Sequence, residues 1–422
     1  MAAGTYEKLF AISEANIVTD ITPTSFTTGD EIADTNFGYG GKFYGSYLYG
    51  TQRQDNGIYS EATTWSLDTW GEYLVACSSK DGKIYEWQLN TANDAVVITN
   101  APTSNLGIVV TEERFLFALG AGGDVRKVRW CDREDNTVWT AAATNEAGDI
   151  ELQSSGQIML GIKARGQTLI LTDLDAHAAT YQGPPFVYGF ERVGSSCGAI
   201  SRRCAASVDR GVFWMGTRGF FVFAGGQVQD VPCEVTDYVF NNINTAQKSL
   251  IHAVTNSKFN EIWWFYPSAA NNECDSYVVF NYEENHWTIG TMARTSGIDA
   301  GVFADPIWFG TDGIAYNHET GSNLTAETVF AESGPFEIGS GDTTMMASML
   351  IPDEKTQGQV TVTFKTRFHP NDTERSYGPY SMAAPTDVRF TGRQVSMRVN
   401  GASSGSWRWG VPRIDAMPSG RR

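Results

Sequence analysis

Short runs rich in Val, Ile, Phe, Trp and Tyr recur along the chain, separated by Gly, Asp and Asn, whereas long helical periodicity is almost absent. Apolar runs of this length, bounded by turn residues, are typical of β-strands. The pattern therefore predicts a mainly β protein.

One unit of this pattern returns six times. It consists of an apolar strand, a turn with a charged residue or Gly, a second apolar strand, a short Gly or Asp turn, and a third strand with an aromatic end. The corresponding positions of the second strands lie about 40 to 55 residues apart, which is the blade length of propellers and related repeats. The six copies begin at Trp65, Gly107, Ile158, Cys204, Ile251 and Ile298, and their second-strand positions are Leu74, Phe115, Leu169, Phe213, Trp263 and Trp308.

This repetition predicts an all-β fold with an irregular six-bladed β-propeller. Antiparallel blades that are arranged radially keep only short, protected edges, which gives a physical reason for the repeat. A set of stacked sandwiches or a pair of jelly rolls is the alternative that stays open, because irregular repeats are also compatible with those folds.

Three regions follow from the pattern. Residues 1–60 hold an N-terminal strand and a loop rich in Gly and Tyr, residues 61–330 hold the blades, and residues 331–422 form a C-terminal β region. The alternation of QVSMRV, from Gln394, predicts that the last region is a small antiparallel sheet or sandwich.

The N-terminal loop places Tyr39, Tyr44 and Tyr49 at regular intervals among glycines. Two interpretations stay open. The loop either packs its tyrosines on the surface of the propeller, or it is an arm that docks on a neighbouring subunit.

Composition and charge describe a folded, acidic protein. Hydrophobic residues make up 41% of the chain, charged residues 19%, and the net charge is −17. Such a chain can bury a large core, and its acidity argues against tight binding to nucleic acid, which requires clustered Lys and Arg. Residues 1–330 carry a net −19 (20 basic against 39 acidic residues), whereas residues 331–422 carry +2 (11 against 9).

The start of the chain has no basic, apolar signal segment, and no apolar run is long enough to cross a membrane. The cysteines are scattered without paired spacing, which favours free thiols in a reducing cytoplasm. They are Cys77, Cys131, Cys197, Cys204, Cys233 and Cys274.

The clearest candidate for chemistry is TDLDAH, where Asp173, Asp175 and His177 could share one face of a strand and offer ligands to a metal. Asp-rich stretches between apolar strands are more often turns, which is the interpretation we prefer. No signature of a nucleophile, zinc site or phosphate loop occurs. We therefore expect no catalytic residue, no metal, no cofactor and no enzymatic activity. A propeller enzyme acting on glycans and a monomeric binding propeller are the alternatives.

Arginines are dense near the C-terminus, where Trp407 and Trp409 flank one of them. Basic residues among aromatic ones can bind nucleic acid. Contacts with an acidic protein surface are the interpretation that the acidic blades favour. The residues are Arg389, Arg393, Arg398, Arg408, Arg413, Arg421 and Arg422.

Several stretches resemble the packaged-DNA stabilisation, or tail nozzle, proteins of short-tailed bacteriophages, over about residues 60 to 422. They are ATTWSLDTWGEYLVACSSKDGKIYEW, NTVWTAAATNEAGDIELQSSGQIMLGIKARGQTLILTD, PPFVYGFERVGSSCGAIS, FWMGTRGFFVF, PCEVTDYVF and FTGRQVSMRVNGASSGSWRWGVPRIDAMPSGRR.

The resemblance implies a structural protein of the virion tail, assembled in the host cytoplasm. Its subunits would form a ring, a hexamer, below the head-to-tail adaptor, with tail fibre or needle proteins as further partners. The ring would retain packaged DNA and conduct it at ejection without binding it tightly. The sequence does not identify the residues that face the channel. The residues we expect at subunit contacts are Tyr39, Tyr44, Tyr49, Arg389, Arg393, Arg398 and Arg408.

Overall fold

The computed structural model describes residues 1–34, 60–321, 329–337, 341–402 and 405–420. Strands make up 48% of the described residues and helices 4%, which confirms the all-β prediction. The chain forms two compact units, Met1–His318 and Glu319–Arg422. Tyr39, Tyr44 and Tyr49 lie outside the described residues, so the two interpretations of their loop stay predictions.

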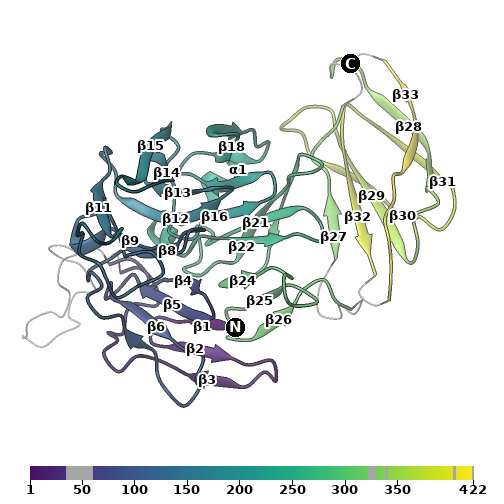
Figure 1. Cartoon of the computed structure of the whole chain (residues 1–422). Coiled ribbons are helices and arrows are strands. Elements are labelled where there is room, and N and C mark those ends of the chain that lie inside the picture. Colours follow the sequence, from purple (N-terminus) through teal and green to yellow (C-terminus); the bar gives the residue numbers. More distant parts are fainter. Residues whose placement is uncertain (35–59, 322–328, 338–340, 403–404, 421–422) are drawn as a thin grey trace, which may run out of the picture. The chain divides into compact units, whose positions relative to one another are not determined.

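Seven antiparallel sheets make up the described part of Met1–His318, and Figure 1 shows most of them following one another around a common centre. Six of them coincide with the six repeats. The first two are β4 to β7 (Trp65–Trp70, Tyr73–Ser78, Ile84–Trp87, Val96–Val97) and β8 to β11 (Gly107–Val110, Leu116–Leu119, Lys127–Trp130, Gly148–Glu151). The next two are β12 to β15 (Ile158–Ala164, Gln167–Thr172, Asp175–Gly183, Val187–Ser195) and β16 to β19 (Ala205–Val208, Gly211–Met215, Phe220–Ala224, Gln227–Val231). The last two are β20 to β23 (His252–Asn256, Glu261–Tyr266, Ser276–Asn281, His286–Thr291) and β24 to β26 (Ser296–Ile298, Ile307–Phe309, Ala315–Asn317).

The seventh sheet comes from the N-terminal residues and consists of β1 (Ala2–Gly4), β2 (Leu9–Ile12) and β3 (Val18–Asp20). It packs against the sheet of β4 to β7, where the Trp65 indole N–H donates to the carbonyl of Thr5 at 2.8 Å. The arrangement is propeller-like, but a count of six blades is not confirmed, because this unit contains seven sheets.

The first strands of the six repeats lie side by side around the centre, in the order β4, β8, β12, β16, β20 and β24. Two glycines allow the closest approaches. A Cβ on Gly107 of β8 would lie 2.8 Å from the hydroxyl oxygen of Ser66, and a Cβ on Gly161 of β12 would lie 2.6 Å from a methyl carbon of Val109. Contacts this short leave no room for a side chain at either glycine. The backbone of each glycine therefore packs directly against a side chain of the neighbouring strand.

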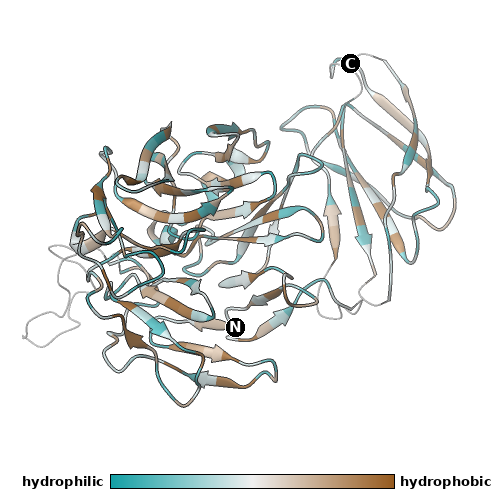
Figure 2. Ribbon diagram, in the orientation of Figure 1, coloured by the Kyte–Doolittle hydropathy of each residue, from teal (hydrophilic) through white to brown (hydrophobic). Residues whose placement is uncertain are grey.

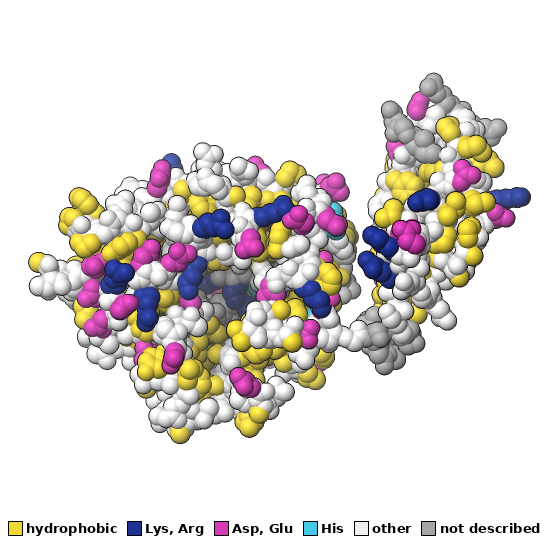
Figure 3. Space-filling model, turned by 45° about the vertical axis from the view of Figure 1, so that its right-hand side comes forward, with side chains coloured by type: hydrophobic (Ala, Val, Ile, Leu, Met, Phe, Trp, Pro, Cys, Tyr) yellow, Lys and Arg dark blue, Asp and Glu magenta, His cyan; other side chains and the backbone are white. Residues whose placement is uncertain are grey.

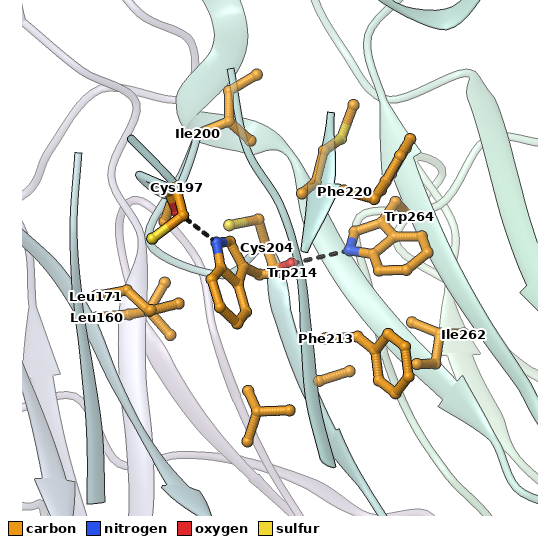
Figure 4. Packing of buried hydrophobic residues seen from close by; sticks show 14 of the residues in the cluster. Leu160, Leu171, Cys197, Ile200, Cys204, Phe213, Trp214, Phe220, Ile262 and Trp264 are labelled. Atoms are coloured by element: carbon orange, nitrogen blue, oxygen red, sulfur yellow. Dashed lines mark hydrogen bonds between the residues drawn. The ribbon is translucent and has the colours of Figure 1, made fainter. Parts of the chain in front are cut away.

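Apolar side chains fill the spaces between neighbouring sheets, and Figure 2 shows hydrophobic residues concentrated within the strands. In the largest cluster the indole of Trp214 donates to the carbonyl of Cys197 at 2.7 Å, and the indole of Trp264 donates to the carbonyl of Cys204 at 2.8 Å (Figure 4). Trp264 lies on β21, whereas Cys204 immediately precedes β16, so this bond joins two neighbouring sheets. Buried indole nitrogens need such partners, which fixes the orientation of the rings.

The N-terminal segment also binds the short helical stretch that precedes β20. This stretch is the 3-10 helix η2 (Thr245–Leu250), and it follows the helix α1 (Thr236–Asn242). The side-chain amide of Gln247 forms a reciprocal pair with Ala33, accepting from its N–H at 2.8 Å and donating to its carbonyl at 3.1 Å. Residues 214 positions apart are thereby held together. A further 3-10 turn is η1 (Ala121–Gly123).

The unit Glu319–Arg422 contains two sheets in its described part, in the orders β27-β32-β29-β30 and β31-β28-β33. Along β29 buried and partly exposed residues alternate without interruption, as expected for a strand with one face on a core. The strands are β27 (Phe330–Glu332), β28 (Met345–Ile351), β29 (Val360–Arg367), β30 (Arg375–Ser381), β31 (Thr386–Gly392), β32 (Gln394–Gly401) and β33 (Arg413–Pro418). Across the described ranges, the helices are all too short or too polar to span a membrane.

Candidate functional site

The inner strands of the propeller-like unit surround a cavity of about 390 Å³, which we call the central hollow. Figure 3 shows the unit hollowed at its centre, with Lys and Arg side chains around and inside the depression. The lining comes from β4, β8, β12 and β16 and from the segment that leads into β16. Its members are Trp65, Ser66, Leu67, Asp68, Ile108, Val109, Leu160, Gly161, Ile162, Lys163, Arg202, Arg203, Ala205 and Ser207.

Lys163 and Asp68 form an ion pair on the wall of the central hollow. The ammonium Nζ of Lys163 lies 3.0 Å from Oδ1 of Asp68, and Oδ2 of the same carboxylate accepts the backbone N–H of Val110 at 2.8 Å. The three residues lie on or at the ends of β12, β4 and β8, so one carboxylate ties three inner strands together. The Lys163 side chain keeps 40% of its surface exposed.

Arg202 lies where the chain enters β16, and its side chain is only 9% exposed. Its guanidinium donates to Oε2 of Glu61 at 3.2 Å and to the carbonyl of Ile158 at 3.4 Å. Glu61 shortly precedes β4 and Ile158 begins β12, so Arg202 links the starts of two other inner strands to that of β16.

Arg203 extends the other way around the ring, toward the starts of β20 and β24. Its guanidinium donates to the carbonyl of Thr295, just before β24, at 3.4 Å, and to that of Leu250, just before β20, at 3.5 Å. Among the described residues it forms no ion pair, and its Nε has no hydrogen-bond partner. Burial lowers the pKa of Arg203 below its ordinary value.

His252, the first residue of β20, pairs with Arg203 through a parallel bridge. Burial, reinforced by the positive charge of Arg203, lowers the pKa of His252 to about 3. The imidazole is therefore neutral at neutral pH, and it adds no positive charge beside the guanidinium.

The central hollow is thus lined by three cations, Lys163, Arg202 and Arg203, and by one carboxylate, Asp68, which pairs with Lys163. Glu61, the partner of Arg202, lies outside the lining. Among the lining residues the excess is two positive charges, which Glu61 and the charge of Glu273 near Arg203 partly offset. This contrasts with the unit as a whole, in which Met1–His318 carries 20 basic and 37 acidic residues. The arrangement offers hydrogen-bond donors and a positive potential, which are the means of attracting an anion.

A second cavity, of about 560 Å³, lies where β14 begins, and its lining includes Asp175, Arg126 and Arg192. Asp173 lies in the turn before β14 and accepts the backbone N–H of Gln157 at 2.9 Å, which agrees with the turn interpretation. Asp175 is buried and accepts from the hydroxyls of Thr172 and Ser154.

His177 completes this cluster, with its Nε2 3.2 Å from Oδ1 of Asp175. Asp173 and Asp175 have separate partners, so the three residues do not converge as one ligand set. In the described residues no group of three or more His, Cys, Asp or Glu side chains is arranged to hold a metal ion.

The arginines that we expected at subunit contacts lie in the unit Glu319–Arg422. Arg389 is exposed on β31 and forms no ion pair or hydrogen bond through its side chain with the described residues. Arg398 is engaged within its own unit, with its Cζ 3.8 Å from the ring centre of Phe330 and Nη1 3.4 Å from Oε2 of Glu332. Arg408 is exposed and pairs through its backbone with Gln357, and Arg393 follows β31. Their role at subunit contacts stays a prediction.

Sequence reasoning missed the residues of the central hollow. Two signals were present: an Arg-Arg pair, Arg202 and Arg203, between apolar segments, and one charged residue, Lys163, within the apolar run of β12. A charge inside an otherwise apolar strand is uncommon unless it is paired or functional.

Neither a family model nor a curated protein matches the sequence. Among solved structures, the chain is similar to virginiamycin B lyase from Staphylococcus aureus, at 7% identity and a TM-score of 0.37, over 63% of this chain and 90% of that one. It is also similar to a dihydro-heme d1 dehydrogenase, at 10% identity and a TM-score of 0.35, over 78% of this chain and 69% of that one. A third is an exo-β-1,3-galactanase from Phanerochaete chrysosporium, at 9% identity and a TM-score of 0.28, over 86% of this chain and 96% of that one.

These similarities require one correction. All three structures are enzymes, which contradicts the expectation of no enzymatic activity, and we withdraw that expectation. At such low identity and TM-score they assign no reaction to this chain, because one fold hosts many unrelated functions.

Proposed function

We propose that the protein is a structural subunit of the tail of a short-tailed bacteriophage. Its copies form a closed ring below the head-to-tail adaptor, which retains packaged DNA and conducts it at ejection. The proposal rests first on the quoted stretches, such as FWMGTRGFFVF and SWRWGVPRIDAM, that resemble tail nozzle proteins.

The structural observation that carries the proposal is the division of charge between the two compact units. Met1–His318 holds the whole net charge of −17, whereas Glu319–Arg422 has 11 basic and 11 acidic residues. An acidic wall repels phosphate and lets DNA slide, and the exposed Arg389 of one copy offers a partner for the acidic unit of the next. A closed ring uses two different surfaces of each subunit, so unequal charge on one chain suits that symmetry.

The number of blades belongs to the same proposal. We count the six sheets from β4 to β26 as blades, since their first strands are consecutive neighbours around the central hollow. The sheet of β1 to β3 then packs on the first blade as an addition.

The test is the mass of the purified full chain in solution, measured by mass photometry with negative-stain images of the same sample. A hexameric ring is expected at low salt, with partial dissociation at high salt because exposed ion pairs are screened. A monomer at every salt concentration and at micromolar protein would contradict the proposal.

A pair of charge reversals localises the contact. Arg389→Glu should shift the ring toward monomers, because it places a negative charge against an acidic neighbour. Arg218→Glu, at an exposed turn of the propeller-like unit, is the matched control and should leave the ring intact. Equal dissociation of both variants would show that net charge alone, and not Arg389, controls assembly.

A further inference from the structure

The central hollow has more positive charge and more hydrogen-bond donors than its own residues use. We propose that it binds a small oxyanion, carried by a phosphate or a carboxylate group, between Arg203 and Lys163. This site lies inside the propeller-like unit of a single subunit, so it does not depend on the proposed ring.

Arg203 is the first reason for the proposal. The charge of Glu273 acts on Arg203, but no carboxylate among the described residues forms an ion pair or hydrogen bond with it. A buried guanidinium without a directly bonded carboxylate is unfavourable, because the hydration it loses is not replaced. Its donors reach only the carbonyls of Thr295 and Leu250, at 3.4 and 3.5 Å, which lie at the outer limit for a hydrogen bond. Guanidinium groups bind oxyanions through shorter, charge-assisted bonds, so an anion in the hollow would supply what these carbonyls do not.

The remaining lining suits the same ligand. The hydroxyls of Ser66 and Ser207 line the central hollow, and neither makes a hydrogen bond with the described residues. Lys163 is partly exposed, and its ion pair with Asp68 can be shared with an incoming anion. Hydroxyl, ammonium and guanidinium donors together are typical of sites for phosphate and carboxylate groups.

The size of the hollow limits the ligand. About 390 Å³ is near the lower end of small-molecule pockets, so it accommodates a free oxyanion or a small molecule that carries one. Asp68 is the one carboxylate in the lining, and it opposes an anion through like charge while it holds Lys163.

The test uses the full chain and measures binding by isothermal titration, with inorganic phosphate in one arm and acetate in the other. Sodium chloride at equal ionic strength is the reference. Arg203→Gln should weaken binding about tenfold or more, since a charge-assisted hydrogen bond is lost. The control is Arg192→Gln, at an exposed arginine that lines the second cavity, and it should bind as the parent does.

A second variant keeps the test decisive if Arg203→Gln does not fold. Asp68→Asn retains an oxygen for the N–H of Val110 but removes the negative charge, so it should tighten binding several-fold. This gain is opposite in sign to the effect of a general loss of structure. Lys163→Gln should weaken binding.

Binding of phosphate alone, of acetate alone, or of both supports the site and identifies the group that it prefers. The proposal is overturned if neither anion binds more strongly than chloride. It is also overturned if Asp68→Asn binds no better than the parent, or if Arg192→Gln loses as much affinity as Arg203→Gln.

Discussion

The ammonium of Lys163 lies 3.0 Å from a carboxylate oxygen of Asp68, and this pair joins β12 to β4 across the intervening strand β8. The two residues are 95 positions apart in the chain. The pair can therefore form only when the inner strands are assembled around their centre.

A double-mutant cycle with Lys163→Gln and Asp68→Asn measures the strength of this pair. The Lys163 side chain is 40% exposed, so we expect a coupling free energy of only about 0.5 kcal/mol at low salt, decreasing as salt increases. The measurement is urea unfolding of the four proteins. A coupling that does not change with salt would argue against an electrostatic origin.

Trp264→Phe removes the indole N–H that bonds the carbonyl of Cys204 and reduces the volume of a fully buried side chain. We expect a loss of about 2 kcal/mol in the free energy of unfolding. Trp263→Phe is the comparison, since the partly exposed Trp263 donates only to Glu261 on its own strand, and its loss should be smaller. Equal losses would show that the bond between sheets contributes little.

Acidification should destabilise the protein before most carboxylates are protonated. The pKa of His252 is lowered from 6.5 to about 3, mainly by burial, so the unfolded chain binds the proton more readily than the folded one. The contribution of neutral His252 to the free energy of unfolding is complete above pH 6.5. It decreases as the pH falls toward 3, by up to about 1.4 kcal/mol per pH unit.

The check is the free energy of unfolding between pH 6.5 and 4.5. His252→Gln should reduce its slope with pH, whereas His369→Gln, at an exposed histidine, should not. His318, whose pKa burial and Arg294 lower to about 4, keeps part of the slope in the His252 variant. An unchanged slope in that variant would mean that His252 is not responsible.

The thiols should react in two classes. All six cysteines are free, and five of them are buried. Burial raises the pKa of Cys131 to about 12 and that of Cys197 to about 11, so these thiolates are scarce at pH 8. With a thiol-reactive chromophore, we expect only the partly exposed Cys233 to react in the folded protein and all six to react in denaturant. Rapid reaction of two or more thiols without denaturant would contradict the burial described above.

Arg398→Gln should destabilise the unit Glu319–Arg422. The guanidinium lies over the ring of Phe330 and pairs with Glu332, and a cation–π contact of this kind is worth about 0.5 to 1 kcal/mol. Calorimetry of the full chain should show the transition of this unit shifted to lower temperature. Arg389→Gln, at an arginine without such partners, should not shift it.

The sequence predicted the strands of the repeats well, because apolar runs and their turns are local signals. The first three repeats begin at Trp65, Gly107 and Ile158, and the strands β4, β8 and β12 begin at the same residues. A single N-terminal strand was predicted where the structure has the sheet of β1 to β3, because strands of three or four residues leave no clear periodicity. The presence of this sheet is also the reason that six blades could not be counted from the repeats alone.

The candidate site was beyond sequence reasoning for a different reason. Asp68, Lys163, Arg202 and Arg203 line one hollow only because separate repeats place their first strands around one axis. The spacing of these residues in the sequence gives no indication that they lie close together. The Asp173 to His177 stretch shows the converse, since its polar residues stood out in the sequence and yet Asp173 has a different partner from the bonded pair of Asp175 and His177.

The reciprocal pair between Ala33 and Gln247 has a consequence for biosynthesis. The ribosome must add 214 residues after Ala33 before its partner exists, which takes about 10 to 40 s at 5 to 20 residues per second. During that interval the nascent N-terminal segment lacks this partner, whereas each later blade can pair its own strands as soon as they emerge. The propeller-like unit should therefore complete its ring late in translation. A ribosome stalled before Gln247 should carry blades that a protease leaves intact, with the sheet of β1 to β3 packed on the first of them, and a chain that the protease cleaves near Ala33.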